Sequence, residues 1–180
     1  MFRNTSRTLV LCSLLFTTGI SGQSAAQAST DADRGGITAW FDGRWIDLSE
    51  GWSDARACTT DGATTTCYRS EAEMDQALDV VASPISVVPL ASCSSSLRLY
   101  RSTSYGGAVL QLTTRYTFIN LSGYGFDNDT SSYRVGACAA YFYDGANGSS
   151  TVYPGATGAN ASAASMLAGW DNRVSSVYVA

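Results

Sequence analysis

The chain has 180 residues, 11 of them Lys or Arg and 15 Asp or Glu, and a formal net charge of −4. This acidic balance lacks the basic footprint that phosphate backbones require, so nucleic acid is not an expected partner. His is absent, which excludes Ser-His and Cys-His nucleophiles and the His ligands of most catalytic zinc sites, whereas a glycosidase built on two carboxylates stays open.

Residues 1–28 have the features of a secretory signal peptide. Arg3 and Arg7 give a positive start, residues 9–20 form a short apolar stretch, and the small-residue sequence Ala-Gln-Ala closes it at residues 26–28. The apolar stretch is too short to span a bilayer, which takes about 20 residues. We therefore expect a secreted protein, extracellular or periplasmic, with no membrane partner.

Residues 29–91 are expected to form a small N-terminal module and a connector. Two β-prone runs within residues 37–48 flank an Asp-Gly pair, which predicts a β-hairpin with a two-residue turn. Three tryptophans in this module, Trp40, Trp45 and Trp52, resemble those in the leader region of uncharacterised secreted bacterial proteins. That resemblance implies no activity, and the sequence leaves open whether the tryptophans pack internally or form a binding face.

A short helix is predicted over residues 70–80. This run contains no Gly or Pro, and Ser70 and Glu73 have the spacing of a capping box. Pro84 and Pro89 follow, and proline cannot continue a helix, so the next residues are expected to form an extended connector.

Four cysteines follow the signal peptide: Cys58, Cys67, Cys93 and Cys138. An even number in an exported chain predicts disulfides, and four cysteines allow three pairings. We expect Cys58 to join Cys67 across a short loop rich in Thr and Gly. That pairing leaves Cys93 for Cys138.

Residues 92–180 are predicted to form a second domain made of short strands. β-prone runs alternate with clusters of Gly, Asn, Asp and Ser, the pattern of an antiparallel sandwich. The expected strands are residues 97–101, 108–112, 118–121, 132–135, 139–143, 150–153, 166–168 and 175–179. Two groups of four strands predict two Greek-key motifs.

A hexapeptide recurs in this second domain. Residues 127–132 read DNDTSS, residues 171–176 read DNRVSS, and each copy leads into a β-prone run. The hexapeptides resemble the calcium-binding signature of microbial βγ-crystallins. Tyr100, Tyr105 and Gly107 match a second mark of that family, two aromatics and a glycine at fixed spacing.

The second copy of that aromatic motif departs from the family pattern. Tyr141 and Gly148 fit the spacing, but Ala146 stands where the second aromatic is expected. The resemblance covers about residues 93–180. It implies an all-β fold in which two Greek-key motifs form a βγ-crystallin-like sandwich, here preceded by the small β-hairpin and short-helix module.

The resemblance also implies two calcium sites, each shared between a signature loop and the hairpin of the other motif. Calcium prefers six to eight oxygen ligands, which Asp, Asn, Ser and free carbonyls supply. The implied ligands are Asp127, Asn128, Asp129 and Ser131, then Asp171, Asn172, Ser175 and the carbonyl of Arg173, with hairpin carbonyls near Thr103 and Asp144. Ser132 and Ser176 are expected to hydrogen-bond within the fold. The same loops also fit Asx turns that bind no metal.

These observations favour a secreted, calcium-binding βγ-crystallin-type protein with a structural or binding role, stabilised by calcium and not an enzyme. The alternative is a secreted metalloproteinase inhibitor of crystallin-like fold, acting through the Gly- and Ala-rich residues 153–161. A hydrolase with paired carboxylates is the third hypothesis. Besides calcium ions, an extracellular protein or a glycan is the partner to consider. The aromatics of this domain are expected to pack in the core or at its rim (Tyr124, Phe126, Tyr133, Phe142 and Tyr178). An exposed aromatic row would bind sugars, but the sequence does not show exposure.

Overall fold

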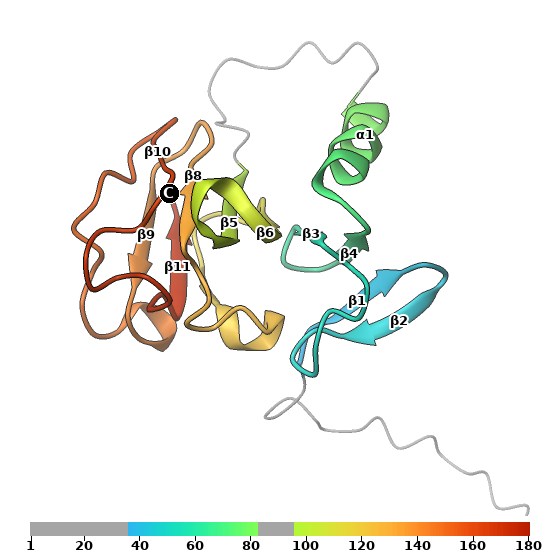
Figure 1. Cartoon of the computed structure of the whole chain (residues 1–180), viewed down its shortest axis with the longest axis horizontal. Helices are drawn as coiled ribbons and strands as arrows, with labels where there is room; N and C mark the ends of the chain where they lie inside the picture. The colour runs from blue at the N-terminus through green and yellow to red at the C-terminus, as the bar shows by residue number, and fades with distance from the viewer. Residues whose placement is uncertain (1–35, 83–95) are drawn as a thin grey trace, which may run out of the picture. The chain divides into compact units, whose positions relative to one another are not determined.

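The computed structural model describes residues 36–82 and 96–180, which fold into short β-strands and, within those ranges, one α-helix (Figure 1). The all-β prediction is confirmed. The strands are β1 Thr38–Phe41, β2 Arg44–Asp47, β3 Ala57–Thr60, β4 Thr65–Tyr68, β5 Leu97–Ser102, β6 Gly106–Leu112, β7 Phe118–Asn120, β8 Ser132–Arg134, β9 Ala140–Tyr143, β10 Ser162–Ala163 and β11 Ser176–Val179. The helix α1 spans Glu71–Ala82, and short 3-10 turns are η1 Thr103–Tyr105, η2 Leu121–Tyr124 and η3 Ala146–Gly148.

Some of the predictions concern residues outside these ranges. The signal peptide, the connector around Pro84 and Pro89 and the boundary after residue 91 all lie there, so each stays a prediction. Within the described ranges, no helix combines the length and the apolar character needed to cross a bilayer.

β1 and β2 form the predicted hairpin. Its turn consists of Asp42 with φ 49° and Gly43 with φ 78°, and two successive positive φ angles are those of a type I′ turn. Trp40 and Trp45 lie opposite each other in the ladder and are 42% and 65% exposed, whereas Trp52 is only 4% exposed. The tryptophans therefore divide into an exposed pair and one core residue.

β3 and β4 form a second hairpin, where the sequence predicted a loop. Threonines flank both cysteines, and their β-branched side chains suit strands. Cys58 and Cys67 stand directly opposite each other and are joined by the predicted disulfide. Cys138 is buried, and the pairing predicted for it stays open because Cys93 lies outside the described residues.

The second hairpin also joins the strands of the N-terminal module to strands of the Greek-key region in one eight-stranded sheet. β4 pairs in parallel with β1, and β3 pairs in parallel with β6. One side of the predicted boundary is thus hydrogen-bonded to the other.

α1 begins one residue after the predicted start, with Ser70 as its N-cap. The Glu73 N–H donates to Ser70 Oγ at 3.1 Å, and Glu73 Oε2 accepts from the Arg69 N–H at 2.9 Å. In the usual capping box the Glu side chain accepts the N–H of the N-cap residue, whereas here it accepts the N–H of the residue before the N-cap. The helix is tied to β5 through Glu71, which accepts from Arg98 Nη1 and from the Tyr100 hydroxyl, each at 2.7 Å.

The buried Tyr100 gives this junction a pH dependence. Burial, and then the hydrogen bond to Glu71, raises the pKa of Tyr100 from 10.0 to about 12. A tyrosine whose folded pKa is raised contributes stability that is fully present below about pH 10 and is lost as pH rises toward about 12. Urea unfolding between pH 8 and 12 should show this loss, and the profile of Tyr100→Phe, which has no proton to release, should be flatter. Equal profiles in the two proteins would contradict the assignment.

The Greek-key region consists of two interlocked groups of strands. β5, β6 and β8 lie in one sheet and β9 and β11 in the other, but the third strand of each group crosses over, because β7 pairs with β11 and β10 pairs with β8. The larger sheet has the order β10-β8-β5-β6-β3-β4-β1-β2, of which the first four strands belong to this region, and the smaller sheet has the order β7-β11-β9. The order β7-β11-β9 repeats the order β10-β8-β5 with the two groups, β5–β8 and β9–β11, exchanged. The two motifs are therefore related by an approximate twofold, as two Greek keys require.

Two of the eight strands expected in this region differ from the prediction. Residues 166–168 form no strand, and β10 at Ser162–Ala163 takes that role. Met166 is 6% exposed, and its N–H donates to Ser131 O at 2.9 Å, so its apolar character reflects burial of a loop rather than a strand. In residues 150–153, Val152 forms an isolated bridge to Tyr143.

Candidate metal centre

The two signature loops lie against each other through reciprocal backbone hydrogen bonds. The Asn128 N–H donates to Val174 O, and the Asn172 N–H donates to Thr130 O, both at 3.0 Å. Asn128 and Asn172 have φ of 53° and 55°, in the left-handed region that Asn tolerates better than most residues. Each loop therefore turns inward at its second residue and reaches the other loop.

This contact brings polar oxygens together in two symmetric pairs. Ser131 Oγ lies 3.2 Å from Asn172 Oδ1, and Ser175 Oγ lies 3.4 Å from Asn128 Oδ1. Each pair takes one residue from each loop, so the predicted ligands are combined across the loops.

The last serine of each signature holds the loop to its own hairpin. Ser132 Oγ donates to Ser102 O at 2.6 Å and accepts the Tyr105 N–H at 3.1 Å. Ser176 Oγ likewise donates to Gly145 O at 2.5 Å and accepts the Gly148 N–H at 3.0 Å. These two serines hydrogen-bond within the fold, as predicted.

The hydrogen bonds also correct the alignment of the second aromatic motif. Ser131 N–H donates to Tyr100 O and Ser175 N–H donates to Tyr143 O, both at 2.8 Å, so Tyr143 rather than Tyr141 is the counterpart of Tyr100. The position of the second aromatic is then Gly148, not Ala146.

Packing explains why position 148 is a glycine and not an aromatic residue. A Cβ on Gly148 would lie 2.2 Å from the ring of Phe118. Phe118 packs edge-on against Tyr143 with ring centroids 5.6 Å apart, just as Tyr105 packs against Tyr100 at 5.6 Å in the first motif. A side chain from β7 thus replaces the aromatic that the second hairpin lacks.

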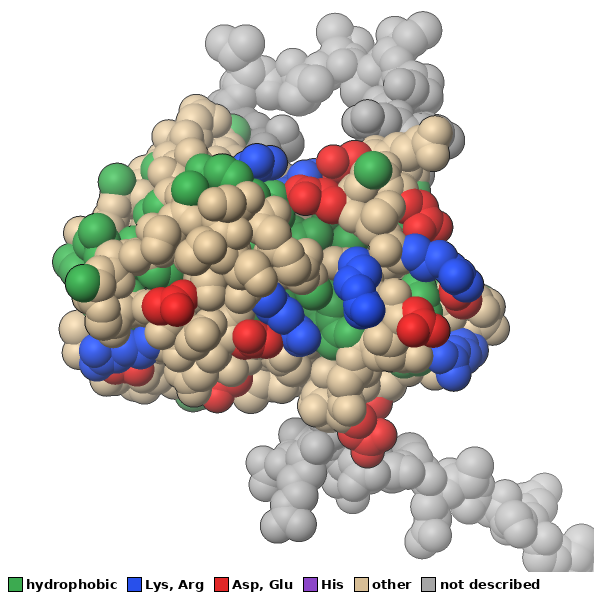
Figure 2. Space-filling view, in the orientation of Figure 1, with side chains coloured by type: hydrophobic (Ala, Val, Ile, Leu, Met, Phe, Trp, Pro, Cys, Tyr) green, Lys and Arg blue, Asp and Glu red, His purple; other side chains and the backbone are tan. Residues whose placement is uncertain are grey.

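An ion pair joins each loop to its hairpin, with the charges exchanged between motifs. In the first motif Arg101 Nε lies 2.9 Å from Asp129 Oδ2, and in the second Arg173 Nη2 lies 2.6 Å from Asp144 Oδ2. Burial raises the pKa of Asp129, and Arg101 offsets part of that rise. Acidic and basic side chains are also interspersed over the face drawn in Figure 2.

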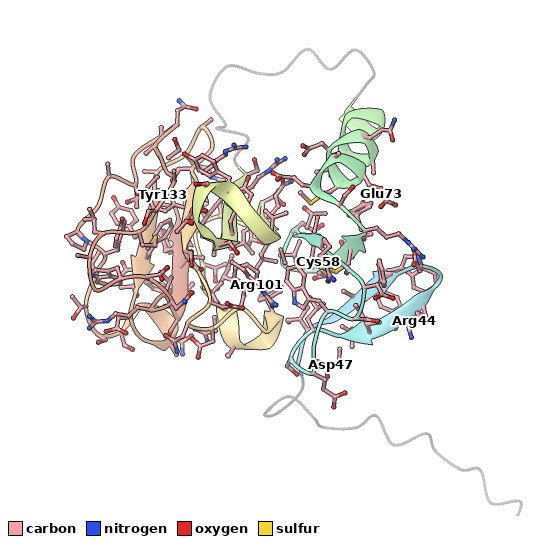
Figure 3. The ribbon with its side chains drawn as sticks, viewed as in Figure 1. Arg44, Asp47, Cys58, Glu73, Arg101 and Tyr133 are labelled. Carbon is pink, nitrogen blue, oxygen red and sulfur yellow. A yellow bond between two sulfur atoms is a disulfide. The ribbon has the colours of Figure 1, made fainter. Side chains whose placement is uncertain are left out.

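Arg101, which is labelled in Figure 3, has further contacts that the sequence did not predict. Its guanidinium lies 4.9 Å from the ring centroid of Trp52 and 5.0 Å from that of Phe126, and Nη2 donates to Gly125 O at 2.7 Å. The sequence did contain a signal for the two ion pairs. Positions that correspond between the two motifs carry opposite charges: Arg101 corresponds to Asp144, and Asp129 corresponds to Arg173.

The remaining predicted ligands are not part of these two oxygen pairs. Asp127 Oδ2 accepts from Asn128 Nδ2 at 3.2 Å, and Asp171 is exposed. Thr103 lies in η1, where its carbonyl accepts the Gly106 N–H. Its counterpart by position is Ala146, whereas Asp144 corresponds to Arg101, so the two predicted hairpin residues are not equivalent.

The loop proposed for protease inhibition is anchored in the fold. Tyr153 is 4% exposed, Tyr133 Oη donates to Ala156 O at 2.8 Å, and the Ala140 N–H donates to Thr157 O at 2.9 Å. Inhibition itself stays a prediction.

No family model and no curated protein matches the chain. Solved βγ-crystallin domains are similar to about half of it. One from Ciona intestinalis has 23% identity and a TM-score of 0.41, and the match covers 47% of this chain and 99% of that one. An archaeal domain has 18% identity and a TM-score of 0.37, and the match covers 48% of this chain and 99% of that one. A domain from Flavobacterium johnsoniae has 21% identity and a TM-score of 0.37, and the match covers 47% of this chain and 92% of that one. The likeness concerns the fold.

Proposed function

We propose that this chain is a secreted calcium-binding protein with a structural or binding role, in which two sites between the signature loops take up calcium and stabilise the Greek-key fold. The observation that carries the proposal is the reciprocal pairing of Ser131 with Asn172 and of Ser175 with Asn128. Each pair supplies a hydroxyl and an amide oxygen, and loop carbonyls add further hard donors of the kind that calcium prefers.

The charge around these pairs favours weak binding. Among the described residues, no three His, Cys, Asp or Glu side chains gather into a metal-binding group, and Arg101 and Arg173 engage Asp129 and Asp144. A calcium site with few charged ligands binds weakly, and extracellular modules bind with Kd of roughly 10⁻⁴ to 10⁻³ M. Such sites fill at millimolar calcium, the condition outside cells, in keeping with the proposed secretion.

Calcium should raise the melting temperature of the mature chain, which is the chain without the predicted signal peptide (residues 29–180). For one site with Kd of about 10⁻⁴ M, about 10 mM calcium stabilises the folded state by about 2.7 kcal/mol, so each of the two sites should add about 5–10 °C for a domain of this size. Thermal unfolding followed by circular dichroism in calcium, in magnesium and in EDTA measures this shift. Magnesium should produce a smaller shift because it demands near-octahedral geometry, and identical curves in calcium and EDTA would remove the proposal.

A further inference from the structure

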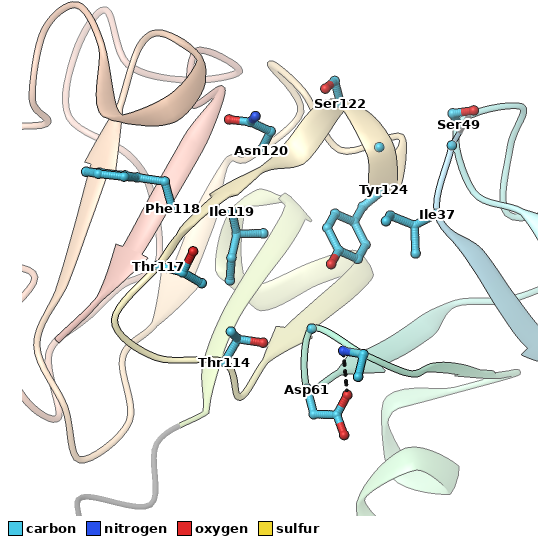
Figure 4. Close-up of a pocket in the computed structure, with 14 residues that line it drawn as sticks. Ile37, Ser49, Asp61, Thr114, Thr117, Phe118, Ile119, Asn120, Ser122 and Tyr124 are labelled. Atoms are coloured by element: carbon cyan, nitrogen blue, oxygen red, sulfur yellow. Dashed lines mark hydrogen bonds between the residues drawn. The ribbon is translucent and has the colours of Figure 1, made fainter. Parts of the chain in front are cut away.

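A groove of about 910 Å³ lies between the N-terminal module and the segment around β7 (Figure 4). Residues 36–37, 49 and 61–63 line one side, and residues from 114 to 124 line the other. This volume is within the range of about 300–1,000 Å³ that small-molecule sites occupy.

The lining of the groove mixes apolar side chains, such as Ile37 and Ile119, with polar ones, and of the lining residues described Asp61 alone is charged. Its polar side chains are mostly hydroxyls and amides, among them Thr117, Asn120 and Ser122, and the described lining contains no Lys or Arg. An anionic ligand would therefore find no countercharge there. A ligand with many hydroxyl groups can exchange hydrogen bonds with every one of these side chains.

Two of these polar groups are held in place by their own neighbourhood. Asp61 Oδ1 accepts the N–H groups of Ala63 and Thr64 at 2.9 and 2.7 Å, and these bonds, that from Thr64 first, lower the pKa of Asp61. Asn120 Oδ1 accepts the Asn147 N–H at 2.7 Å, and Asn120 Nδ2 donates to Asn147 Oδ1 at 2.9 Å. The ionised carboxylate and the amide thus have fixed orientations before any ligand arrives.

A row of exposed and half-buried aromatic rings continues from the rim of the groove. Phe118 lines the groove and is 44% exposed, and it pairs across the ladder with Tyr178, ring centroids 5.2 Å apart. Tyr178 pairs in turn with Tyr141, which is 45% exposed, at 6.4 Å. The row crosses all of β7-β11-β9, while the alternate residues Ile119, Phe142 and Val177 are buried beneath it.

We propose that the groove and this aromatic row together bind a neutral oligosaccharide. A sugar ring presents C–H faces that pack on aromatic rings, with hydroxyl groups around its edge. Stacking on Phe118, Tyr178 and Tyr141 suits those faces, and the hydroxyls, amides and single carboxylate of the groove suit the edge. The lack of basic side chains in the described lining selects neutral over acidic glycans.

Affinity electrophoresis of the mature chain tests the proposal. Gels containing neutral polysaccharides (β-glucan, xylan, mannan or soluble chitin oligomers) should retard the protein in at least one case, and gels containing polygalacturonate or alginate should not. Tyr141→Ala and Tyr178→Ala should weaken the retardation at least about fivefold, as truncation of a contact residue commonly does. Trp45→Ala, an exposed aromatic on the other module, is the matched control and should bind like the parent protein.

Each gel is run in calcium and in EDTA, and the retardation should persist in both because none of the groove residues belongs to the signature loops. This separates the glycan site from the calcium proposal. Melting temperatures of the variants within about 3 °C of the parent protein show that they fold. The proposal is overturned if no neutral polysaccharide retards the protein, if only acidic ones do, or if the tyrosine variants bind as well as the parent. Dimerisation through the aromatic row without retardation would also overturn it.

Discussion

Gly125→Ala should destabilise the protein by about 2–5 kcal/mol. Gly125 has φ +61°, and a Cβ there would lie 2.2 Å from the backbone oxygen of Leu48. The left-handed backbone costs an L-residue about 1–2 kcal/mol, and relief of a clash with backbone adds about 1–3 kcal/mol because the neighbouring chain must shift. Leu48 belongs to the N-terminal module, so the substitution would force the module away from η2.

Gly169→Ala is the matched control for this substitution. Gly169 has φ +78°, and no atom lies within 4 Å of the place that a methyl group would take there, so only the backbone strain of about 1–2 kcal/mol remains. Urea unfolding of both variants gives the difference directly. Equal losses of stability would show that Leu48 and Gly125 do not approach as closely as described.

Trp52→Ala should cost about 3–5 kcal/mol, the usual range for a buried tryptophan. The ring of Trp52 packs on Phe126 with centroids 5.4 Å apart and supports the Arg101 guanidinium, and Nε1 donates to Tyr124 O at 2.7 Å. Its removal leaves a cavity and frees Arg101 on one side.

Two further variants separate the contributions of Trp52. Trp52→Phe keeps an aromatic ring but leaves the Tyr124 carbonyl without its donor, which should cost about 1–3 kcal/mol. Trp45→Ala removes a tryptophan that is 65% exposed and should change stability by less than about 1 kcal/mol, the range of a cross-strand pair. If Trp52→Ala were as mild as Trp45→Ala, the packing of the module on the Greek-key region would be contradicted.

The predictable part of the fold rests on local chemistry. Asp42-Gly43 specifies its own turn, Ser70 caps the helix that follows it, and Cys58 and Cys67 are close in sequence. The signature loops were found because both copies keep the same residues at the second and fifth positions. These are the residues that meet: Asn128 with Ser175, and Asn172 with Ser131.

The features that were missed depend on contacts between distant segments. The parallel pairing of β3 with β6 has no local signal, and neither does the position of Arg101 between Trp52 and Phe126. The second aromatic motif was misaligned because Phe118, from another strand, fills the place that its own hairpin leaves empty. Spacing within one segment cannot reveal such a substitution.

The most direct test of the account is a calorimetric titration of calcium into the mature chain, alongside a double variant, Ser131→Ala with Ser175→Ala. The parent protein should bind two ions with Kd of roughly 10⁻⁴ to 10⁻³ M, and the double variant should bind much more weakly because each oxygen pair has lost its hydroxyl. Ser165→Ala, an exposed serine outside both loops, should bind like the parent. The absence of calcium heat in the parent protein, or unchanged binding in the double variant, would contradict the assignment of calcium to these loops.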